Sequence, residues 1–238
     1  MQIFYTTSFD IEKNTCFLTE EDSYHCIKVL RKKEGEKIYI TDGKGHLLTG
    51  TITNQDTKKT FVAIIEIQIQ EKNENENLTI AIAPTKNMDR MEWFVEKATE
   101  IGIGNIIPIL TERGERDKLK TERLHKIAIS AMKQSKNYYL PNIFELTNLK
   151  DLMQHCIGFE RFVAHCGDVE KHLFKLINCK QKTIVLIGPE GDFTQKEIDF
   201  LKTNNFQEVN LGETRLRTET AGLAATMIFQ INKLSNSL

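Results

Sequence analysis

Two glycine-bearing segments near the C-terminus contain the residues best suited to chemistry. Residues 187–194 read Ile-Gly-Pro-Glu-Gly-Asp-Phe-Thr, and residues 211–221 read Leu-Gly-Glu-Thr-Arg-Leu-Arg-Thr-Glu-Thr-Ala. Each segment follows a short apolar run typical of a strand and leads into a helical pattern. Ligands of open α/β sheets bind beside the C-terminal ends of the strands, so the two turns together predict one ligand pocket.

The first turn does not have the composition of a phosphate-binding loop. It lacks the Gly-x-x-x-x-Gly-Lys-Ser/Thr and Gly-x-Gly-x-x-Gly patterns, and Glu190 would repel a phosphate. Gly188 and Gly191 allow positive φ or a close backbone approach, and Pro189 stiffens the turn. We therefore expect a cationic or hydroxyl-bearing ligand, with a tight turn that binds nothing as the alternative.

The second turn carries two arginines directly before the last predicted helix. Arg215 and Arg217 could stabilise negative charge on a ligand. The alternative is a surface ion pair with Glu213 or Glu219. Thr218 is the predicted N-cap of the helix, and Glu219 in the first turn would interact favourably with the helix dipole.

The rest of the C-terminal region alternates between strand and helix patterns. Strands are predicted over residues 78–83, 106–110, 161–165, 183–187 and 208–211, and helices over 88–101, 121–136, 169–177, 194–203 and 218–234. Thr194 and Glu197 fit a capping box, which starts one helix directly after the first turn. This alternation predicts a parallel α/β sheet with helices on both faces.

The N-terminal region has a different pattern. Strands rich in β-branched residues are predicted over residues 36–42, 47–53 and 61–69. Residues 72–77 read Lys-Asn-Glu-Asn-Glu-Asn and contain no apolar side chain, which indicates a linker. We therefore expect a small β-rich domain over residues 1–71, a linker over 72–77 and an α/β domain over 78–238.

Composition excludes several classes of protein. The chain has 238 residues, of which 40% are hydrophobic and 27% charged. This composition is typical of a globular protein and not of a disordered or membrane-spanning one. Residues 1–5 lack the layout of a signal peptide. The five cysteines form no Cys-x-x-Cys pair, and the three His-Cys pairs are too far apart for a zinc site. We expect free thiols and a cytoplasmic protein without metal.

A net charge of −1 gives no overall attraction to nucleic acid, so local clusters must provide it. One cluster, residues 28–33, reads Lys-Val-Leu-Arg-Lys-Lys and lies close to His25. A second basic stretch, residues 113–136, is interleaved with acidic residues. Both could bind phosphates, and for both a solvated face is the alternative.

The chain resembles a known family over nearly its full length. The matching residues, in order, are His25-x-x-x-Val29-Leu30-Arg31, 90–93 with 97–102, Pro108 with Glu112-Arg113, Gln134-Ser135, 188–194 and 211–221. Its second half resembles the SPOUT class of S-adenosylmethionine-dependent RNA methyltransferases. The whole chain resembles the family of ribosomal RNA small subunit methyltransferase E, which methylates N3 of a uridine in 16S rRNA of the small ribosomal subunit.

The resemblance implies a fold that composition could not reveal. The α/β domain is expected to be a trefoil-knotted parallel sheet, and the N-terminal domain a PUA-like β-barrel. The family also forms homodimers with the active site at the interface, so a homodimer is expected here.

The resemblance also implies a cofactor, S-adenosylmethionine, held between the two turns. The expected cofactor-binding residues are Leu186, Gly188, Pro189, Glu190, Gly191, Leu211, Gly212, Leu216, Arg217, Thr220 and Ala221. The expected RNA-binding residues are His25, Arg31, Lys32, Lys33, Arg113, Arg116 and Lys133. Gly114 stands where the family often has serine, so no hydroxyl contact is expected from that loop.

Methylation of uridine N3 requires that the proton on this nitrogen leave. Arg217 is the candidate for stabilising the uridine anion, and Glu190 or Glu219 is the candidate for accepting the proton. Two other functions remain open: a non-catalytic RNA-binding module, and a nucleotide-binding α/β enzyme that would lack its phosphate loop.

Overall fold

The protein is described from a computed structural model that covers residues 1–70 and 74–235. The chain forms two compact units, one of Met1–Asn73 with Ile129–Leu140 and the other of Glu74–Ala128 with Pro141–Leu238. Residues 72 and 73 of the predicted linker lie outside the described residues. Glu74–Asn77 form a 3-10 helix, η2, instead of an extended linker.

Residues 129–140 group with the N-terminal unit, although the sequence placed them in the α/β domain. Backbone hydrogen bonds hold them there: Gly45 N–H donates to Tyr138 O at 2.8 Å, and Leu140 N–H donates to Gly43 O at 2.9 Å. These bonds join residues about ninety positions apart, which no local pattern reveals.

The N-terminal unit is built on a six-stranded sheet with the strand order β1-β4-β5-β6-β3-β2. The strands are β1 (Ile3–Tyr5), β2 (Ser8–Asp10), β3 (Thr15–Phe17), β4 (Lys37–Thr41), β5 (His46–Ile52) and β6 (Phe61–Ile69). The β1–β4 pair is parallel and the other pairs are antiparallel. Helix α1 (Glu20–Tyr24) and the π-helix η1 (His25–Val29) follow β3.

This sheet is curled. The hydroxyl of Thr6, just after β1, donates to the carbonyl of Phe17 at the end of β3, at 2.7 Å. The two strands stand first and fifth in the strand order, so such a bond requires the sheet to bend back on itself. Side chains such as Ile40, Leu48 and Val62 fill the interior of the bend.

The C-terminal unit contains a parallel sheet with the strand order β10-β8-β7-β12-β11-β13, and β9 pairs with β8. The strands are β7 (Leu78–Ile82), β8 (Asn105–Leu110), β9 (Asn142–Ile143), β10 (Thr147–Asn148), β11 (Glu160–Ala164), β12 (Thr183–Ile187) and β13 (Gln207–Val209). Every residue of β7 and β12 is buried. Continuous apolar runs of this kind are typical of parallel strands covered on both faces.

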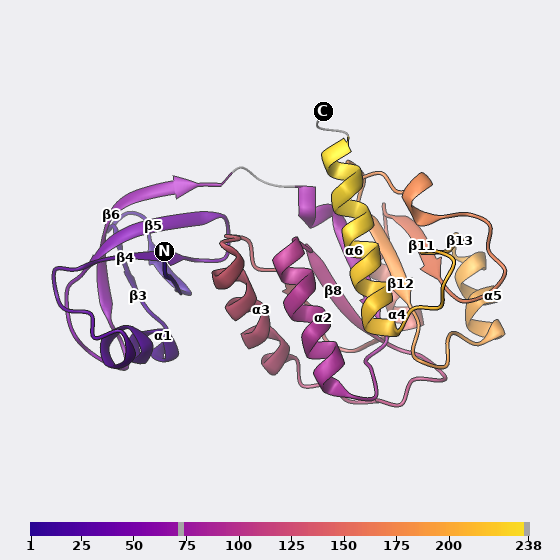
Figure 1. Ribbon diagram of the computed structural model, residues 1–238, viewed down its shortest axis with the longest axis horizontal. Helices are drawn as coiled ribbons and strands as arrows, with labels where there is room; N and C mark the ends of the chain where they lie inside the picture. The colour runs from indigo at the N-terminus through magenta and orange to yellow at the C-terminus, as the bar shows by residue number, and fades with distance from the viewer. Residues whose placement is uncertain (71–73, 236–238) are drawn as a thin grey trace. The chain divides into compact units, whose positions relative to one another are not determined.

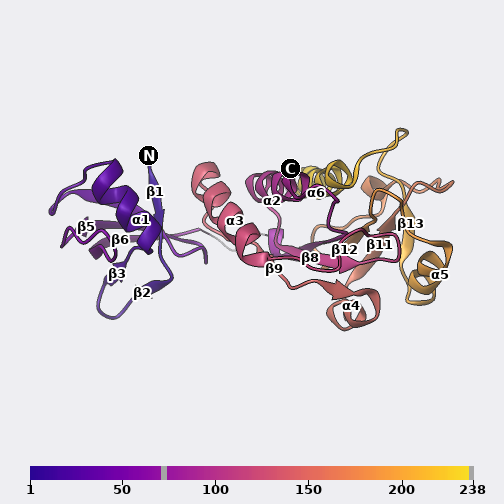
Figure 2. The same ribbon diagram turned by 90° about the horizontal axis from the view of Figure 1, so that it is seen from below.

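Helices cover both faces of this sheet, as predicted (Figure 2). Helices α2 (Met88–Ile101) and α6 (Thr218–Ser235) lie on one face, and α4 (Leu149–His155) and α5 (Gln195–Thr203) on the other. Helix α6 packs on α2 and over β7 and β12 (Figure 1). A Cβ on Gly222 would lie 2.7 Å from the Phe94 ring, so the two helices approach closely because this residue is glycine. Helix α3 spans Thr121–Ser135.

Two local predictions are wrong. The predicted helix over residues 169–177 is reduced to the 3-10 helix η3 (Leu173–Lys175), because the preceding backbone pairs elsewhere. Asn210 N–H donates to Lys171 O at 2.8 Å, and Leu173 N–H donates to Asn210 O at 3.1 Å. Thr218 does not cap α6: it is the first helical residue, and its hydroxyl donates to Gly188 O.

The predicted capping box at the start of α5 is confirmed, with Thr194 as N-cap and Glu197 reaching back to its backbone. Helix α4 is absent from the sequence prediction. Within the described part of the chain, no helix has the length and apolar character needed to cross a membrane.

Candidate cofactor and catalytic site

A two-part hollow lies at the C-terminal ends of β11 and β12. Its two parts have volumes of about 280 Å³ and 520 Å³ and share part of their walls. The shared wall residues are Ala164, His165, Cys166, Arg215, Leu216 and Ala221. The hollow therefore lies at the edge of the sheet where the two turns were predicted to meet.

Side chains of the second turn bind carbonyls of the first. The hydroxyl of Thr218 donates to Gly188 O at 3.0 Å, and the guanidinium of Arg215 donates to Glu190 O at 3.1 Å. A Cβ on Gly188 would lie 3.0 Å from the Phe193 ring, so a larger residue would push the turn apart. The two turns are thus one structural unit.

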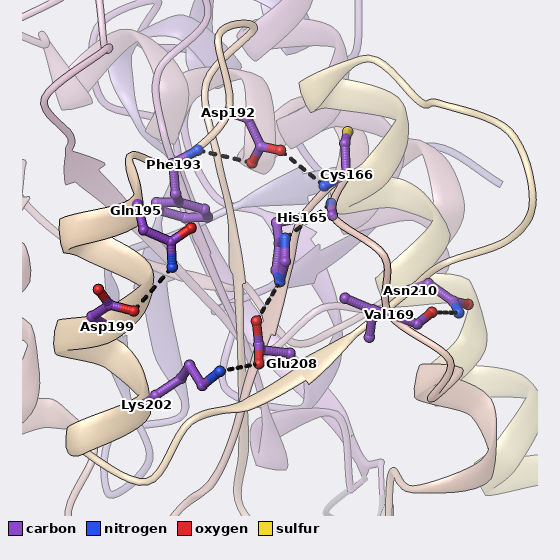
Figure 3. A network of polar contacts seen from close by, with 11 residues as sticks. His165, Cys166, Val169, Asp192, Phe193, Gln195, Asp199, Lys202, Glu208 and Asn210 are labelled. Carbon is purple, nitrogen blue, oxygen red and sulfur yellow. Dashed lines mark hydrogen bonds and ion pairs between the residues drawn. The ribbon is translucent and has the colours of Figure 1, made fainter.

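A third loop, residues 165–169, completes the wall. Asp192 joins it to the first turn: one carboxylate oxygen accepts from Cys166 N–H at 2.8 Å, and the other accepts from Phe193 N–H at 2.8 Å (Figure 3). Asp192 has φ of 62°, a left-handed conformation that aspartate tolerates better than most residues. Sequence reasoning missed this loop, although it directly follows a predicted strand and so belongs to the ligand edge of the sheet.

His165 anchors the third loop. Its Nδ1 accepts from Gly167 N–H at 3.0 Å, so its Nε2 carries the proton and donates to Glu208 at 3.0 Å (Figure 3). Lys202 binds the other oxygen of Glu208 at 2.7 Å. The ammonium of Lys202, and then the His165 ring, hold the pKa of Glu208 below its ordinary value.

Two arginines predicted to bind RNA donate hydrogen bonds to backbone carbonyls close to the pocket. Arg113 donates to Gly191 O at 2.8 Å, in the first turn. Arg116 donates to Lys86 O at 2.7 Å. Both guanidinium groups therefore support the backbone close to the pocket.

Gly114 lies in a tight turn between these two arginines. Its N–H donates to Thr111 O at 3.0 Å. A Cβ on Gly114 would lie 2.9 Å from the hydroxyl oxygen of Thr111, so a serine would force that side chain to move. The close approach of Thr111 therefore favours glycine over serine at this position.

The two candidate bases lie in different environments. Glu190 is exposed and lines the pocket, and its carboxylate accepts from Lys86 N–H at 3.1 Å. Glu219 is 6% exposed and is not among the wall residues. Its carboxylate faces Arg90 at 3.7 Å, and the second oxygen has no hydrogen-bond partner among the described residues. The geometry therefore favours Glu190 as the candidate base. Arg217, the candidate for stabilising the uridine anion, also lines the pocket.

The predicted cofactor residues divide into two groups. Those that line the hollow are Gly188, Pro189, Glu190, Leu211, Gly212, Leu216, Arg217 and Ala221. The others are Leu186, which is buried in the core beneath the first turn, Gly191, which contacts Arg113, and Thr220. The wall residues that sequence reasoning did not select include Ala164, His165 and Asp192.

The predicted RNA-binding residues of the N-terminal unit also differ from one another. Arg31 and Lys33 are exposed, whereas Lys32 binds Glu36 at 2.7 Å. Arg31 has φ of 54°. His25 accepts from the Gln2 amide at 3.1 Å, and Lys133 donates to the Asp22 carboxylate at 2.7 Å.

Four of the five cysteines are buried, and Cys166 is exposed. Burial raises the pKa of Cys16 to about 12, and those of Cys26 and Cys156 to about 11. Such thiols are poor nucleophiles and poor metal ligands. Over the residues that the structure describes, no group of three or more His, Cys, Asp or Glu could hold a metal ion.

The fold is that of a SPOUT-class methyltransferase preceded by a PUA-like domain. Residues 72–230 match the family model described as RNA methyltransferase domain, and residues 18–66 match the RNA methyltransferase PUA domain. The chain belongs to this RNA methyltransferase family.

Known relatives match nearly the whole chain. Ribosomal RNA small subunit methyltransferase E of Aquifex aeolicus is 29% identical, over 96% of this chain and 98% of its own. The crystal structure of a probable rRNA-methyltransferase from Porphyromonas gingivalis is 34% identical, with a TM-score of 0.89, over 99% of this chain and 100% of its own. Ribosomal RNA small subunit methyltransferase E from Neisseria gonorrhoeae, solved bound to S-adenosyl methionine, is 26% identical, with a TM-score of 0.85 over 97% of both chains.

Proposed function

We propose that this protein is an S-adenosylmethionine-dependent methyltransferase that modifies N3 of a uridine in 16S rRNA. The observation that carries the proposal is the hollow at the ends of β11 and β12, walled by turns that hydrogen-bond to each other. The Neisseria relative, which shares the fold, was solved with the same cofactor. Ribosomal subunits lie in the cytoplasm, which is where we place the protein.

The walls of the hollow fit this cofactor better than a nucleotide phosphate. Ile187, Leu216 and Ala221 offer apolar surface, and the turns expose backbone groups that can pair with an adenine. The Glu190 carboxylate would attract the positive sulfonium and repel a phosphate. The residues proposed to hold the cofactor are Gly188, Pro189, Glu190, Leu211, Gly212, Leu216 and Ala221.

When bound, the cofactor would supply a methyl group on a positively charged sulfur. The remaining task of the protein is to align the uridine and to remove its N3 proton. We propose that the guanidinium of Arg217 stabilises the uridine anion and that Glu190 accepts the proton. Glu219 is the weaker candidate for the base because its carboxylate faces Arg90.

We further propose a homodimer. Helices α2 and α6 expose Trp93 (42%), Met227 (42%), Ile231 (45%) and Leu234 (66%). The three residues of α6 follow the spacing i, i+4, i+7 and therefore form one stripe. A continuous apolar surface of this kind usually marks a protein interface.

The predicted knot is also a proposal. Asn210 accepts and donates backbone bonds with residues 171–173, and its side-chain amide donates to Val169 O. The segment after the edge strand β13 is thus bonded to the loop that follows β11, before α6 returns to pack over β7 and β12 in the middle of the sheet. That path supports a knot, one of the rare exceptions to simple chain connections.

The test of the proposed function is substitution of Arg217. Arg217→Ala should lower methylation of 16S rRNA at least about 100-fold while leaving the fold intact, because a lost charge-stabilising donor costs roughly that much. Mass mapping of rRNA nucleosides, with and without the protein, measures 3-methyluridine. The matched control is Arg217→Lys, which keeps the charge and should retain partial activity.

Two results would contradict the proposal. If the wild-type protein left the amount of 3-methyluridine unchanged, the proposed substrate would be wrong. If Arg217→Ala showed near-normal turnover, the proposed role of the arginine would be wrong. Binding of labelled S-adenosylmethionine separates an enzyme from a non-catalytic RNA-binding module.

A further inference from the structure

A second pocket, of about 480 Å³, lies within the N-terminal unit. Its walls come from the N-terminal segment, from the α1–η1 helices, and from the end of α3 that belongs to this unit. We infer that this pocket binds one unstacked base of the RNA substrate. The inference rests on the proposed function, because it takes RNA as the substrate.

The α3 side of the pocket presents hydrogen-bonding groups on one face. Ser130, Lys133 and Gln134 line it and are spaced three and four residues apart, so they share a helical face. Ser130 and Gln134 are exposed, and their side chains form no hydrogen bond with the described residues. Their groups are therefore available to a ligand, and Gln134 offers both a donor and an acceptor.

The charge of the pocket argues against a phosphate. Asp22, which is 4% exposed, accepts from Lys133 at 2.7 Å and from Tyr5 N–H at 2.6 Å. The positive charge of Lys133 is therefore already neutralised. Glu21 also lines the pocket and adds a negative charge. An uncharged ligand with donors and acceptors along one edge fits these walls better than an anion.

A nucleobase has that chemistry. Proteins that read single-stranded RNA bind splayed-out bases through hydrogen bonds to their edges and through stacking on aromatic or histidine rings. The His25 ring lines the pocket and is oriented by the Gln2 amide, which donates to it at 3.1 Å. The Gln134 amide can pair with the base edge while the His25 ring provides a stacking surface. The volume lies within the range typical of small-ligand sites, roughly 300–1,000 Å³.

The decisive variants are Gln134→Ala and Ser130→Phe. Both positions are exposed on α3, so neither change should disturb the core. The first removes the base-pairing amide and the second fills the pocket. The matched control is Gln55→Ala, which removes an exposed amide of the same unit outside the pocket. The measurement is binding of a single-stranded 16S rRNA fragment containing the target uridine, at several salt concentrations.

We expect both variants to weaken RNA binding at least about tenfold, because base-edge contacts of this kind contribute that much. The salt dependence should not change, because no phosphate contact is lost. Binding of S-adenosylmethionine should also be unchanged. RNA affinities within twofold of the Gln55→Ala control for both variants would overturn the inference. A reduced salt slope would also overturn it, because it would identify a phosphate site.

The two proposals fail separately. If the wild-type protein methylates the rRNA and the pocket variants bind RNA normally, only the proposed base pocket is contradicted. If the wild type forms no 3-methyluridine but the variants lose RNA binding, the base pocket is supported and the proposed reaction is contradicted.

Discussion

Two basic regions of this protein look alike in sequence but place their charges differently. In residues 28–33, Arg31 and Lys33 are exposed to solvent. In the stretch that begins at Arg113, Arg113 and Arg123 are also exposed, but their guanidinium groups bind the protein itself: Arg113 binds a carbonyl of the first turn, and Arg123 binds Glu92 at 2.8 Å. A basic side chain can thus bind either the phosphates of RNA or polar groups of its own chain, and composition does not distinguish these two roles.

The difference has a structural cause. The turns of the C-terminal unit have carbonyl groups that no strand or helix partner satisfies, and an arginine fork supplies several donors to such groups. In the loop after η1, Lys32 binds the Glu36 carboxylate, and the side chains of Arg31 and Lys33 have no hydrogen bond or ion pair with the described residues. We therefore expect the first region to control RNA affinity and the second to control the shape of the cofactor pocket.

Within the two basic regions, the largest expected effect comes from Arg113→Ala. Loss of its hydrogen bond to Gly191 O should loosen the first turn and lower S-adenosylmethionine affinity about tenfold, since such charged bonds contribute roughly 1.5–3 kcal/mol. Titration calorimetry measures the affinity. Lys118→Ala, at an exposed position of the same stretch, is the control. If Arg113→Ala instead reduced only RNA binding and its salt slope, the contrast between the regions would be wrong.

A smaller effect is expected from the double variant Arg31→Ala and Lys33→Ala. Loss of two phosphate contacts should reduce the salt slope of RNA binding by about 1.4, with cofactor affinity unchanged. Lys32→Ala should reduce the slope by less than the roughly 0.7 expected for one phosphate contact, because Glu36 already binds the Lys32 ammonium. Filter binding over a range of salt concentrations measures both variants. A loss of about 0.7 from Lys32→Ala would show that the ion pair opens when RNA binds.

The smallest effect concerns the loop that His165 anchors. The pKa of Glu208 lies below its ordinary value, so its ionised form stabilises the fold at neutral pH. Glu208→Gln should lower the free energy of unfolding by less than about 1 kcal/mol at pH 7. The difference should vanish as pH falls through the depressed pKa of Glu208, where the wild-type carboxylate also becomes neutral. Urea unfolding at several pH values measures it, and a constant difference at all pH values would contradict the prediction.

Much of the fold followed from local pattern. The bounds of β6, α2 and β12 agree with the predicted ranges 61–69, 88–101 and 183–187. These elements are long or strongly periodic, so their own side chains specify them. The predicted helix over residues 169–177 failed because its apolar spacing competes with backbone pairing to Asn210, a residue distant in sequence.

The candidate site shows the same limit. The glycine turns were visible from their composition and from their position after apolar strands. Their partners were not: the bonds from Arg113 to Gly191 O and from Cys166 N–H to the Asp192 carboxylate join loops far apart in the chain.

The sequence by itself therefore determined most of the longer strands and helices and the two turns, because periodicity, glycine and capping residues act over a few positions. The family resemblance added the cofactor and the reaction. Only the tertiary structure decided which charges face solvent and which bind carbonyls, that residues 129–140 belong to the N-terminal unit, and that the loop of His165 completes the pocket. These three features depend on which groups, far apart in the sequence, the fold brings within hydrogen-bonding distance. A local sequence pattern does not show which groups these will be.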